Sequence, residues 1–255
     1  MTNLELYNTI FKRKSIRKYD MTPLNDEVLA GIKDYTDKLK PLDDSIKYSF
    51  EFIGSKDVKF MMPVKLAPHY ICIYSEKKQG YLMNAGYLLQ QVDLYLSVNN
   101  IGSCWLGMGK PAKGIMNHAN GQEFVIMLAF GNAAEQVHRE SASEFKRKSI
   151  DEITSINGSE QLLEPVRLAP SATNSQPWFF SGNTQEIIVS RKKLNFVKEK
   201  LLGEFNQVDI GISLYHMWLS LEHEGKTAVY DFRTAEAPED YEFMVKVNTM
   251  EKSKI

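Results

Sequence analysis

Cysteine is scarce in this 255-residue sequence, and the little there is forms no pattern. Cys72 and Cys104 do not stand at the spacing of a paired metal or redox motif. The five histidines make no His-Glu-x-x-His or other ligand spacing, so we expect no metal site. There is also no Gly-x-Ser-x-Gly or Cys–His pairing of a hydrolase, although a triad scattered along the chain stays open. Two unpatterned thiols favour a reducing cytoplasm.

Long apolar runs and a dominant charge are missing too. The longest clear apolar run, residues 124–130, is far too short to span a bilayer. The first seven residues lack the basic-then-apolar pattern of a signal peptide, so we expect none. A formal net charge of -1 gives no electrostatic reason to expect a nucleic acid or a membrane as partner. What remains is the ordinary composition of a globular protein, with 43% hydrophobic and 25% charged residues.

The hydrophobic pattern predicts both helices and strands. Asn25 is a suitable N-cap for the first helix, and a polar stretch at residues 132–148 is interpreted as a linker or arm. The predicted helices cover residues 26–39, 81–98, 161–166 and 208–224, and the predicted strands cover residues 48–53, 69–74, 124–130, 187–190, 229–232 and 241–247.

Three short features recur later in the chain in the same order. They are Gly86 with Gly211 (211 − 86 = 125), the RKSI at 13–16 with the RKSI at 147–150 (147 − 13 = 134), and Pro41 with Pro170 (170 − 41 = 129). This recurrence predicts an internal duplication, with one repeat at residues 1–145 and the other at 146–255. Chance recurrence of helical and basic patterns is the alternative.

Three segments could carry chemistry. The first, KRKSIRKYD at residues 12–20, combines five basic residues with a serine, which suits a phosphate or a polar cofactor chain. Its alternative is a solvated charge run. The second, residues 100–114, has glycines at 102, 107 and 109 that let a ligand approach the backbone. Its alternative is a glycine-rich connection between helix and strand, and it is not a P-loop because Pro111 follows Lys110.

The most specific segment is APSATNSQPW, residues 169–178. Ser171 and Asn174 supply donors and acceptors, and Pro170 and Pro177 restrict the backbone at both ends. Donors fixed in this way suit the edge of a planar heterocycle with carbonyls and ring nitrogens. The alternative is a structured turn that leads into a strand at Trp178.

Together these segments resemble the flavin-dependent nitroreductase family. The family's Arg-Arg-Ser-x-Arg-x-Phe/Tyr segment is residues 13–19 here, and its Gly-Leu-Gly-x-x-Trp-x-Gly connection is 101–107. Its strand ending in glycine is 124–131, its basic tail 146–148, and its Pro-Ser-x-x-Asn-x-Gln-Pro-Trp loop 170–178. The resemblance implies an α+β fold with a central, mostly antiparallel sheet flanked by helices.

The order of these motifs departs from the family. In ordinary members the Pro-Ser loop follows the first helix, but here that place holds residues 41–47, which keep the proline and lack the Asn and the Gln-Pro-Trp. The intact loop stands in the second repeat, which in turn has no Trp-x-Gly connection after Gly225. Family enzymes are homodimers in which both subunits hold each FMN. The resemblance therefore implies a fused pseudo-dimer, monomeric in solution, with one complete composite site.

Residue roles follow from the resemblance by position. Arg13, Lys14 and Ser15 would hold the FMN phosphate and ribityl chain, with help from Arg147. Lys14 keeps the charge of the family's arginine but loses its two-pronged geometry. The isoalloxazine ring would be met at its edge by Ser171, Ala172 and Asn174, and through main-chain groups by Leu106 and Gly107. We assign Arg17 to structure, and Trp105, Trp178 and Tyr19 to packing.

The activity that the resemblance implies is a ping-pong hydride transfer. NAD(P)H would reduce FMN, and a nitroaromatic, a quinone or a related acceptor would then be reduced. The flavin carries the chemistry, so no catalytic side chain is expected. Two alternatives stay open, namely a flavin-binding protein without turnover and a different flavin chemistry on the same fold.

Overall fold

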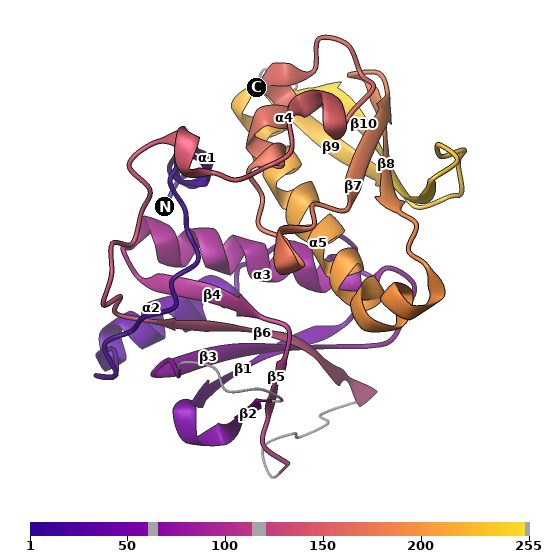
Figure 1. Cartoon of the computed structure of the whole chain (residues 1–255). Coiled ribbons are helices and arrows are strands. Elements are labelled where there is room, and N and C mark those ends of the chain that lie inside the picture. Colours follow the sequence, from indigo (N-terminus) through magenta and orange to yellow (C-terminus); the bar gives the residue numbers. More distant parts are fainter. Residues whose placement is uncertain (61–65, 114–120, 253–255) are drawn as a thin grey trace. The chain divides into compact units, whose positions relative to one another are not determined.

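The chain divides into two compact units in a computed structural model that describes residues 1–60, 66–113 and 121–252 (Figure 1). The middle unit is Lys12–Ser141. The terminal unit combines Met1–Phe11 with Ala142–Ile255. The first helix thus belongs with the C-terminal half of the sequence.

The middle unit is built on a four-stranded antiparallel sheet in the order β1-β3-β6-β4. A small ribbon of β2 and β5 accompanies it. Its elements in chain order are α2 (Asp26–Thr36), β1 (Tyr48–Gly54), β2 (Val58–Phe60), β3 (His69–Ser75), α3 (Tyr81–Val98), β4 (Gly102–Leu106), β5 (Gly109–Pro111) and β6 (Glu123–Gly131).

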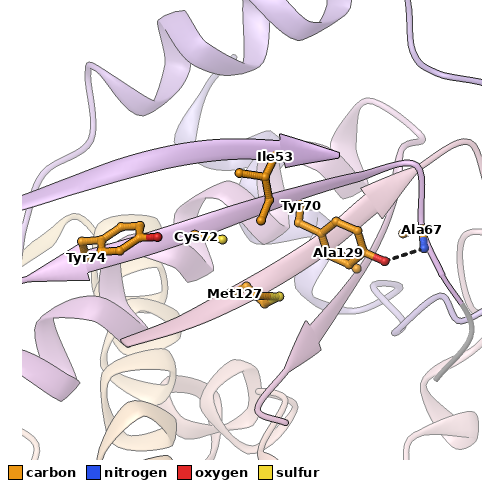
Figure 2. Packing of buried hydrophobic residues seen from close by; sticks show 7 residues of the cluster. All are labelled: Ile53, Ala67, Tyr70, Cys72, Tyr74, Met127 and Ala129. Carbon is orange, nitrogen blue, oxygen red and sulfur yellow. Dashed lines mark hydrogen bonds between the residues drawn. The ribbon is translucent and has the colours of Figure 1, made fainter. Parts of the chain in front are cut away.

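The central strand β3 carries much of this unit's core. It pairs on both sides, and six of its seven residues are buried, which fits its continuous apolar sequence. Tyr70 faces Ala129 across the β3–β6 ladder and Cys72 faces Met127. Figure 2 shows these side chains together, with the N–H of Ala67 donating to the Tyr70 hydroxyl at 2.8 Å. That bond gives the phenol a partner inside an otherwise apolar cluster.

The terminal unit also holds a four-stranded antiparallel sheet, in the order β7-β8-β10-β9. Helix α1 packs on α5, where Tyr7 stacks on His223 with ring centroids 4.0 Å apart and Asn3 donates to Glu222 at 3.1 Å. The elements are α1 (Asn3–Ile10), α4 (Glu160–Arg167), β7 (Trp178–Gly182), β8 (Glu186–Lys192), α5 (Phe196–His223), β9 (Lys226–Asp231) and β10 (Tyr241–Glu251).

The two sheets have the same topology. In each, a helix precedes the first strand, the first two strands are neighbours, and a long helix connects the second strand to the third. The fourth strand of each set then inserts between the second and the third. Helices α2 and α3 of the middle unit therefore correspond to α4 and α5 of the terminal unit.

The expected α+β fold with antiparallel sheets is confirmed, and the described strands divide between two four-stranded sheets and the two-stranded ribbon of β2 and β5. Several elements differ from the sequence prediction, among them helix α1, which was not predicted. Helix α5 begins at Phe196, twelve residues before the predicted start (208 − 196 = 12), and the glycine-rich segment contains the strands β4 and β5. The polar stretch predicted as a linker is partly paired, because Arg13 bridges to His138 and Tyr19 to Ala133.

Within the described parts of the chain, no helix combines the length and the apolar character that crossing a bilayer needs.

Candidate functional site

The loop before β7 has an unusual backbone. Thr173, Asn174 and Gln176 have φ angles of 51°, 58° and 47°, in the left-handed region that residues other than glycine seldom occupy. Each such residue costs on the order of 1–3 kcal/mol and persists only where surrounding contacts enforce it. A strained, enforced loop is a common property of binding sites. We call residues 171–176 the strained loop.

The basic tail supplies many of those contacts. Arg147 donates from Nη1 to Asn174 Oδ1 at 2.6 Å, and Asn174 Nδ2 donates to the carbonyl of Lys146 at 2.8 Å. The backbone N–H of Lys148 donates to Gln176 Oε1 at 2.7 Å, and its Nζ donates to the carbonyl of Gln176 at 2.9 Å. Two motifs that are 27 residues apart in sequence therefore form one interlocked structure.

Arg147 also braces the chain that leads into the loop. Its Nε donates to the carbonyl of Ala169 at 3.1 Å, and its Nη2 donates to that of Leu168 at 3.4 Å. A guanidinium fits this task because it presents a rigid fork of donors. Arg147 thus holds the loop, and its expected role at a phosphate stays a prediction.

A buried carboxylate on α5 completes the support. The N–H of Ala172 donates to both oxygens of Asp209, at 3.0 and 3.1 Å, and Asp209 is 3% exposed. Burial raises the pKa of Asp209 to about 8, against the lowering effect of the Ala172 N–H. Sequence reasoning missed this residue. The available signal was its place two residues before Gly211, at the start of the recurrent helix pattern.

The strained loop still has polar capacity for a ligand. Ser171 Oγ accepts from the N–H of Gln176 at 2.9 Å, which leaves its own proton to donate elsewhere. Ser175 Oγ is buried and has no hydrogen-bond partner among the described residues. A buried hydroxyl without a partner costs free energy unless something else satisfies it. The Ser175 oxygen is closed off from solvent, whereas the half-buried Ser171 hydroxyl suits a ligand with polar atoms along its edge.

Arg13, in the middle unit, forms a buried ion pair. Its Nε lies 2.7 Å from Asp93 Oδ2 and its Nη2 donates to Oδ1 at 3.2 Å, with both side chains almost fully buried. Ser103 Oγ and Gln90 Nε2 also donate to Asp93, at 2.6 and 3.2 Å. The charge of Arg13 is thus largely compensated inside the unit. The pair anchors the basic segment to α3.

The rest of the basic segment runs extended beside β4. The N–H of Ile16 donates to the carbonyl of Ser103 at 2.8 Å, and the N–H groups of Arg17 and Lys18 donate to Glu135 Oε1 at 2.9 and 3.1 Å. Lys14 is half-buried, and Arg17 and Lys18 are exposed. The sequence assigns Arg17 a structural role. Its backbone N–H has such a role, because it donates to Glu135, while the residue is exposed to solvent.

Ser15 lies beside Cys104 of β4. Burial raises the pKa of the Cys104 thiol, while Arg17, Arg13 and a hydrogen bond from Ser15 act in the opposite direction. A buried thiol with a raised pKa is a poor nucleophile. Ser15 is itself only half-buried, so its hydroxyl remains within reach of solvent.

Leu106 and Gly107 stand at the end of β4. Leu106 packs against the core cluster of Figure 2, and Gly107 is exposed in the turn toward β5. The neighbouring Gly102 and Gly109 serve packing, because a Cβ would come within 2.9 Å of Ile16 at the first and of Phe60 at the second. Of the three glycines considered as a ligand approach, Gly107 alone is exposed.

The predicted site residues therefore form two groups, one in each unit. The terminal unit joins Arg147, Ser171, Ala172 and Asn174 around the strained loop, and the middle unit holds Arg13, Lys14, Ser15, Leu106 and Gly107 on the basic segment and β4. Trp178, at 1% exposed, and Tyr19, packed on the core cluster, confirm the packing roles expected for them.

Comparisons with known proteins agree on one family. A sequence model of the family described as "Putative TM nitroreductase" matches residues 5–221. The crystal structure of a putative nitroreductase from Thermotoga maritima is similar with a TM-score of 0.64 and 20% identity, covering 97% of this chain and 95% of that chain. This match extends over both units and shows the fold.

Two other solved structures match over little more than half of this chain. A nitroreductase with bound FMN from Desulfitobacterium hafniense has a TM-score of 0.42 and 15% identity, covering 58% of this chain and 100% of its own. A nitroreductase family protein from Clostridium novyi has a TM-score of 0.43 and 16% identity, covering 55% of this chain and 89% of its own. No curated protein matches the sequence.

Proposed function

Because this chain belongs to the TM nitroreductase family, we propose that it is an FMN-dependent oxidoreductase. Its electron donor would be NAD(P)H, and its acceptor a nitroaromatic, a quinone or a related compound. The observation that carries the proposal is the interlocking of the strained loop with the basic tail. It holds Asn174 and Arg147 together in a conformation that costs free energy.

The chemistry of the two groups fits FMN. The strained loop offers the proton of the Ser171 hydroxyl and the second amide hydrogen of the exposed Asn174, which suit the carbonyls and ring nitrogens of an isoalloxazine. The middle unit offers the cation of Lys14 and the hydroxyl of Ser15, which suit a phosphate and a ribityl chain. Arg13 anchors the segment that carries Lys14 and Ser15 through its ion pair with Asp93, which compensates the charge of Arg13.

The proposed roles of the chain are binding and orientation. FMN, when bound, supplies hydride transfer between a nicotinamide and an acceptor. Lys14 and Ser15 hold the polar chain, the strained loop orients the ring edge, and the main chain at Leu106 and Gly107 contacts the ring. No side chain is given a proton-transfer role.

We further propose that the chain is an internal duplication that works as a monomer. The identical topology of the two sheets supports this, as do the three recurring sequence features. FMN binding would then need residues of both repeats, 1–145 and 146–255. The cytoplasmic location expected from the sequence stays a prediction.

The first experiment is a visible spectrum of the purified protein after reconstitution with FMN and desalting, followed by anaerobic NADH or NADPH. Retained flavin absorbance that bleaches with the nicotinamide supports the oxidoreductase. Retained colour without bleaching supports a flavin-binding protein or another flavin chemistry. A colourless protein contradicts the proposal.

Two substitutions test the residue assignment. We expect Asn174→Ala and Lys14→Ala each to weaken FMN binding by about tenfold or more, since each removes a charged or polar contact worth about 1.5 kcal/mol. Fluorescence titration with FMN measures both.

Matched controls exist for each substitution. Asn183→Ala removes an asparagine that caps a turn of the same unit through Gln185 and Glu186, and Lys38→Ala removes an exposed lysine at the end of α2. Both control variants should bind FMN with the same affinity as the wild type. If Asn174→Ala and Asn183→Ala bind FMN with equal affinity, the strained loop is not part of the FMN site.

A further inference from the structure

The two long helices carry a buried acceptor at corresponding positions. In the middle unit, Asn84 Oδ1 on α3 accepts from the N–H groups of Leu42 and Asp43, at 2.8 and 3.2 Å. In the terminal unit, Asp209 on α5 accepts from the N–H of Ala172. The two acceptors are 125 positions apart (209 − 84 = 125), the separation of Gly86 and Gly211.

Both acceptors act on the same part of each loop. Leu42 directly follows Pro41, and Ala172 comes two residues after Pro170. Asn84 and Asp209 are 1% and 3% exposed, so neither side chain is solvated well enough to replace a lost partner with water. Each long helix therefore holds the loop that precedes its sheet's first strand, between α2 and β1 in the middle unit and between α4 and β7 in the terminal unit.

The hydrogen bond from Ala172 to Asp209 stabilises a strained backbone conformation. The Ala172 N–H lies directly before Thr173 and Asn174, two of the three residues of the strained loop that have positive φ. Without Asp209, the loop would lose an anchor at the start of its least favourable backbone turn. Asn174 would then be held by its hydrogen bonds with Arg147, Lys146 and Gln176.

We infer that Asp209 is the positioning residue that holds the strained loop in the form that binds the flavin edge. The identity of the ligand rests on the proposed function, and the contact between Asp209 and the loop rests on the structure. The middle unit supplies the contrast, since its loop has the same grip from Asn84 and lacks the Asn and the Gln-Pro-Trp. Holding the loop is thus a shared task, and flavin recognition belongs to the terminal loop.

The first arm of the test measures the grip without any flavin. Hydrogen exchange, followed by mass spectrometry, compares wild type, Asp209→Ala and Asn84→Ala, each checked for folding by circular dichroism. We expect Asp209→Ala to speed exchange in peptides covering residues 171–176 and to leave 41–46 unchanged. Asn84→Ala should do the reverse. Unchanged exchange at 171–176 in Asp209→Ala overturns the inference.

The second arm measures FMN binding by the same proteins. We expect Asp209→Ala to bind FMN about tenfold to a hundredfold more weakly. Asp209→Asn, which keeps an acceptor like that of Asn84, should restore most of the affinity. A loop that loosens while FMN binding stays unchanged overturns the inference. A wild type that binds no FMN overturns the proposed function, and the exchange data then still decide whether Asp209 holds the loop.

A third variant covers the case in which Asp209→Ala does not fold. Ala172→Pro removes the N–H donor instead of the acceptor. Ser171 already has the extended backbone that a residue before proline prefers, with φ −146° and ψ 158°, and Ala172 is the first residue of a short 3-10 helix, where proline is tolerated. Ala172→Pro should speed exchange at the loop like Asp209→Ala. The double variant should add nothing, and additive effects would overturn the inference.

Discussion

Asp209 makes the stability of the molecule depend on pH. Its pKa in the folded protein is raised to about 8 from an ordinary value of 3.8. The folded state therefore binds this proton more tightly than the unfolded chain, so its stabilising effect is full below about pH 4 and is lost as pH rises through about 8. We expect the wild type to lose unfolding free energy between about pH 6 and about pH 9.

Asp209→Asn isolates this effect, because an amide does not titrate. Urea denaturation of both proteins at the two pH values measures it. The variant should show a smaller loss than the wild type over this interval. Parallel losses in the two proteins would mean that Asp209 does not govern the pH dependence.

The Arg13–Asp93 pair is an anchor whose partners depend on each other. Removing one partner leaves a buried charge uncompensated, at a cost of about 3–5 kcal/mol. We expect Arg13→Met and Asp93→Leu each to lower the urea midpoint strongly, and the double variant to recover part of the loss. Lys77→Ala is the control, since both side chains of its ion pair with Glu123 are exposed, at 58% and 56%, and the pair should matter little. Additive losses in the double variant would contradict the coupling.

The candidate site could be predicted from sequence only as far as its motifs are local. Asn174 and Ser171 sit in one contiguous loop, and the two prolines beside them already indicate a fixed backbone. Arg13 could be recognised as a basic residue of a motif, but its partner Asp93 is 80 residues away, so no local pattern shows that its charge is compensated. Asp209 was missed for the same reason.

At the scale of elements, the hairpin between β7 and β8 depends on one glycine. Gly182 has φ 97°, and a Cβ there would meet the carbonyl oxygen of Glu186 at 2.3 Å. Gly158 has φ 70° with nothing within 4 Å of a Cβ. Alanine at either position carries the left-handed penalty of about 1–2 kcal/mol, and Gly182 adds a clash with backbone that cannot move freely.

The two alanine variants therefore form a matched pair. We expect Gly182→Ala to lower the thermal midpoint clearly more than Gly158→Ala, measured by calorimetry. If both variants lose the same amount, the backbone angle alone sets the cost and the turn adjusts around the new methyl group.

Helices and strands were predictable where their apolar pattern is continuous. Helix α3 matches residues 81–98, because nearly all of its side chains are buried and the pattern never breaks. Helix α5 begins twelve residues before its predicted start, and its first turns expose Phe196 and Leu201, at 86% and 66%, so no inward stripe marks them. Helix α1 was missed because it is short and half exposed, and its capping box at Thr2 and Glu5 is the signal that was available.

At the scale of the whole molecule, the two sheets have the same topology, but the corresponding loops at residues 41–47 and 170–178 differ in sequence. The two sheets share their strand order, and each long helix carries a buried acceptor that holds the loop before its sheet's first strand. Residues 41–47 nevertheless lack the Asn and the Gln-Pro-Trp that residues 170–178 contain. Under the proposed duplication, the scaffold has been kept in both repeats, while the ligand-recognising side chains have been kept in one.

This asymmetry predicts one FMN per chain. Each complete set of ligand groups needs one intact Pro-Ser loop, and the sequence contains one, so a titration monitored by flavin fluorescence should saturate at a single equivalent. A pseudo-dimer already contains both halves of the family's subunit pair, so light scattering should give the mass of one 29.2 kDa chain. Saturation at two equivalents would mean that the loop at residues 41–47 also binds flavin. A dimer that saturates at one FMN per chain would mean that the strained loop and the basic segment of each site come from different chains. In that case a mixture of the Asn174→Ala and Lys14→Ala proteins would regain FMN binding that neither variant has alone.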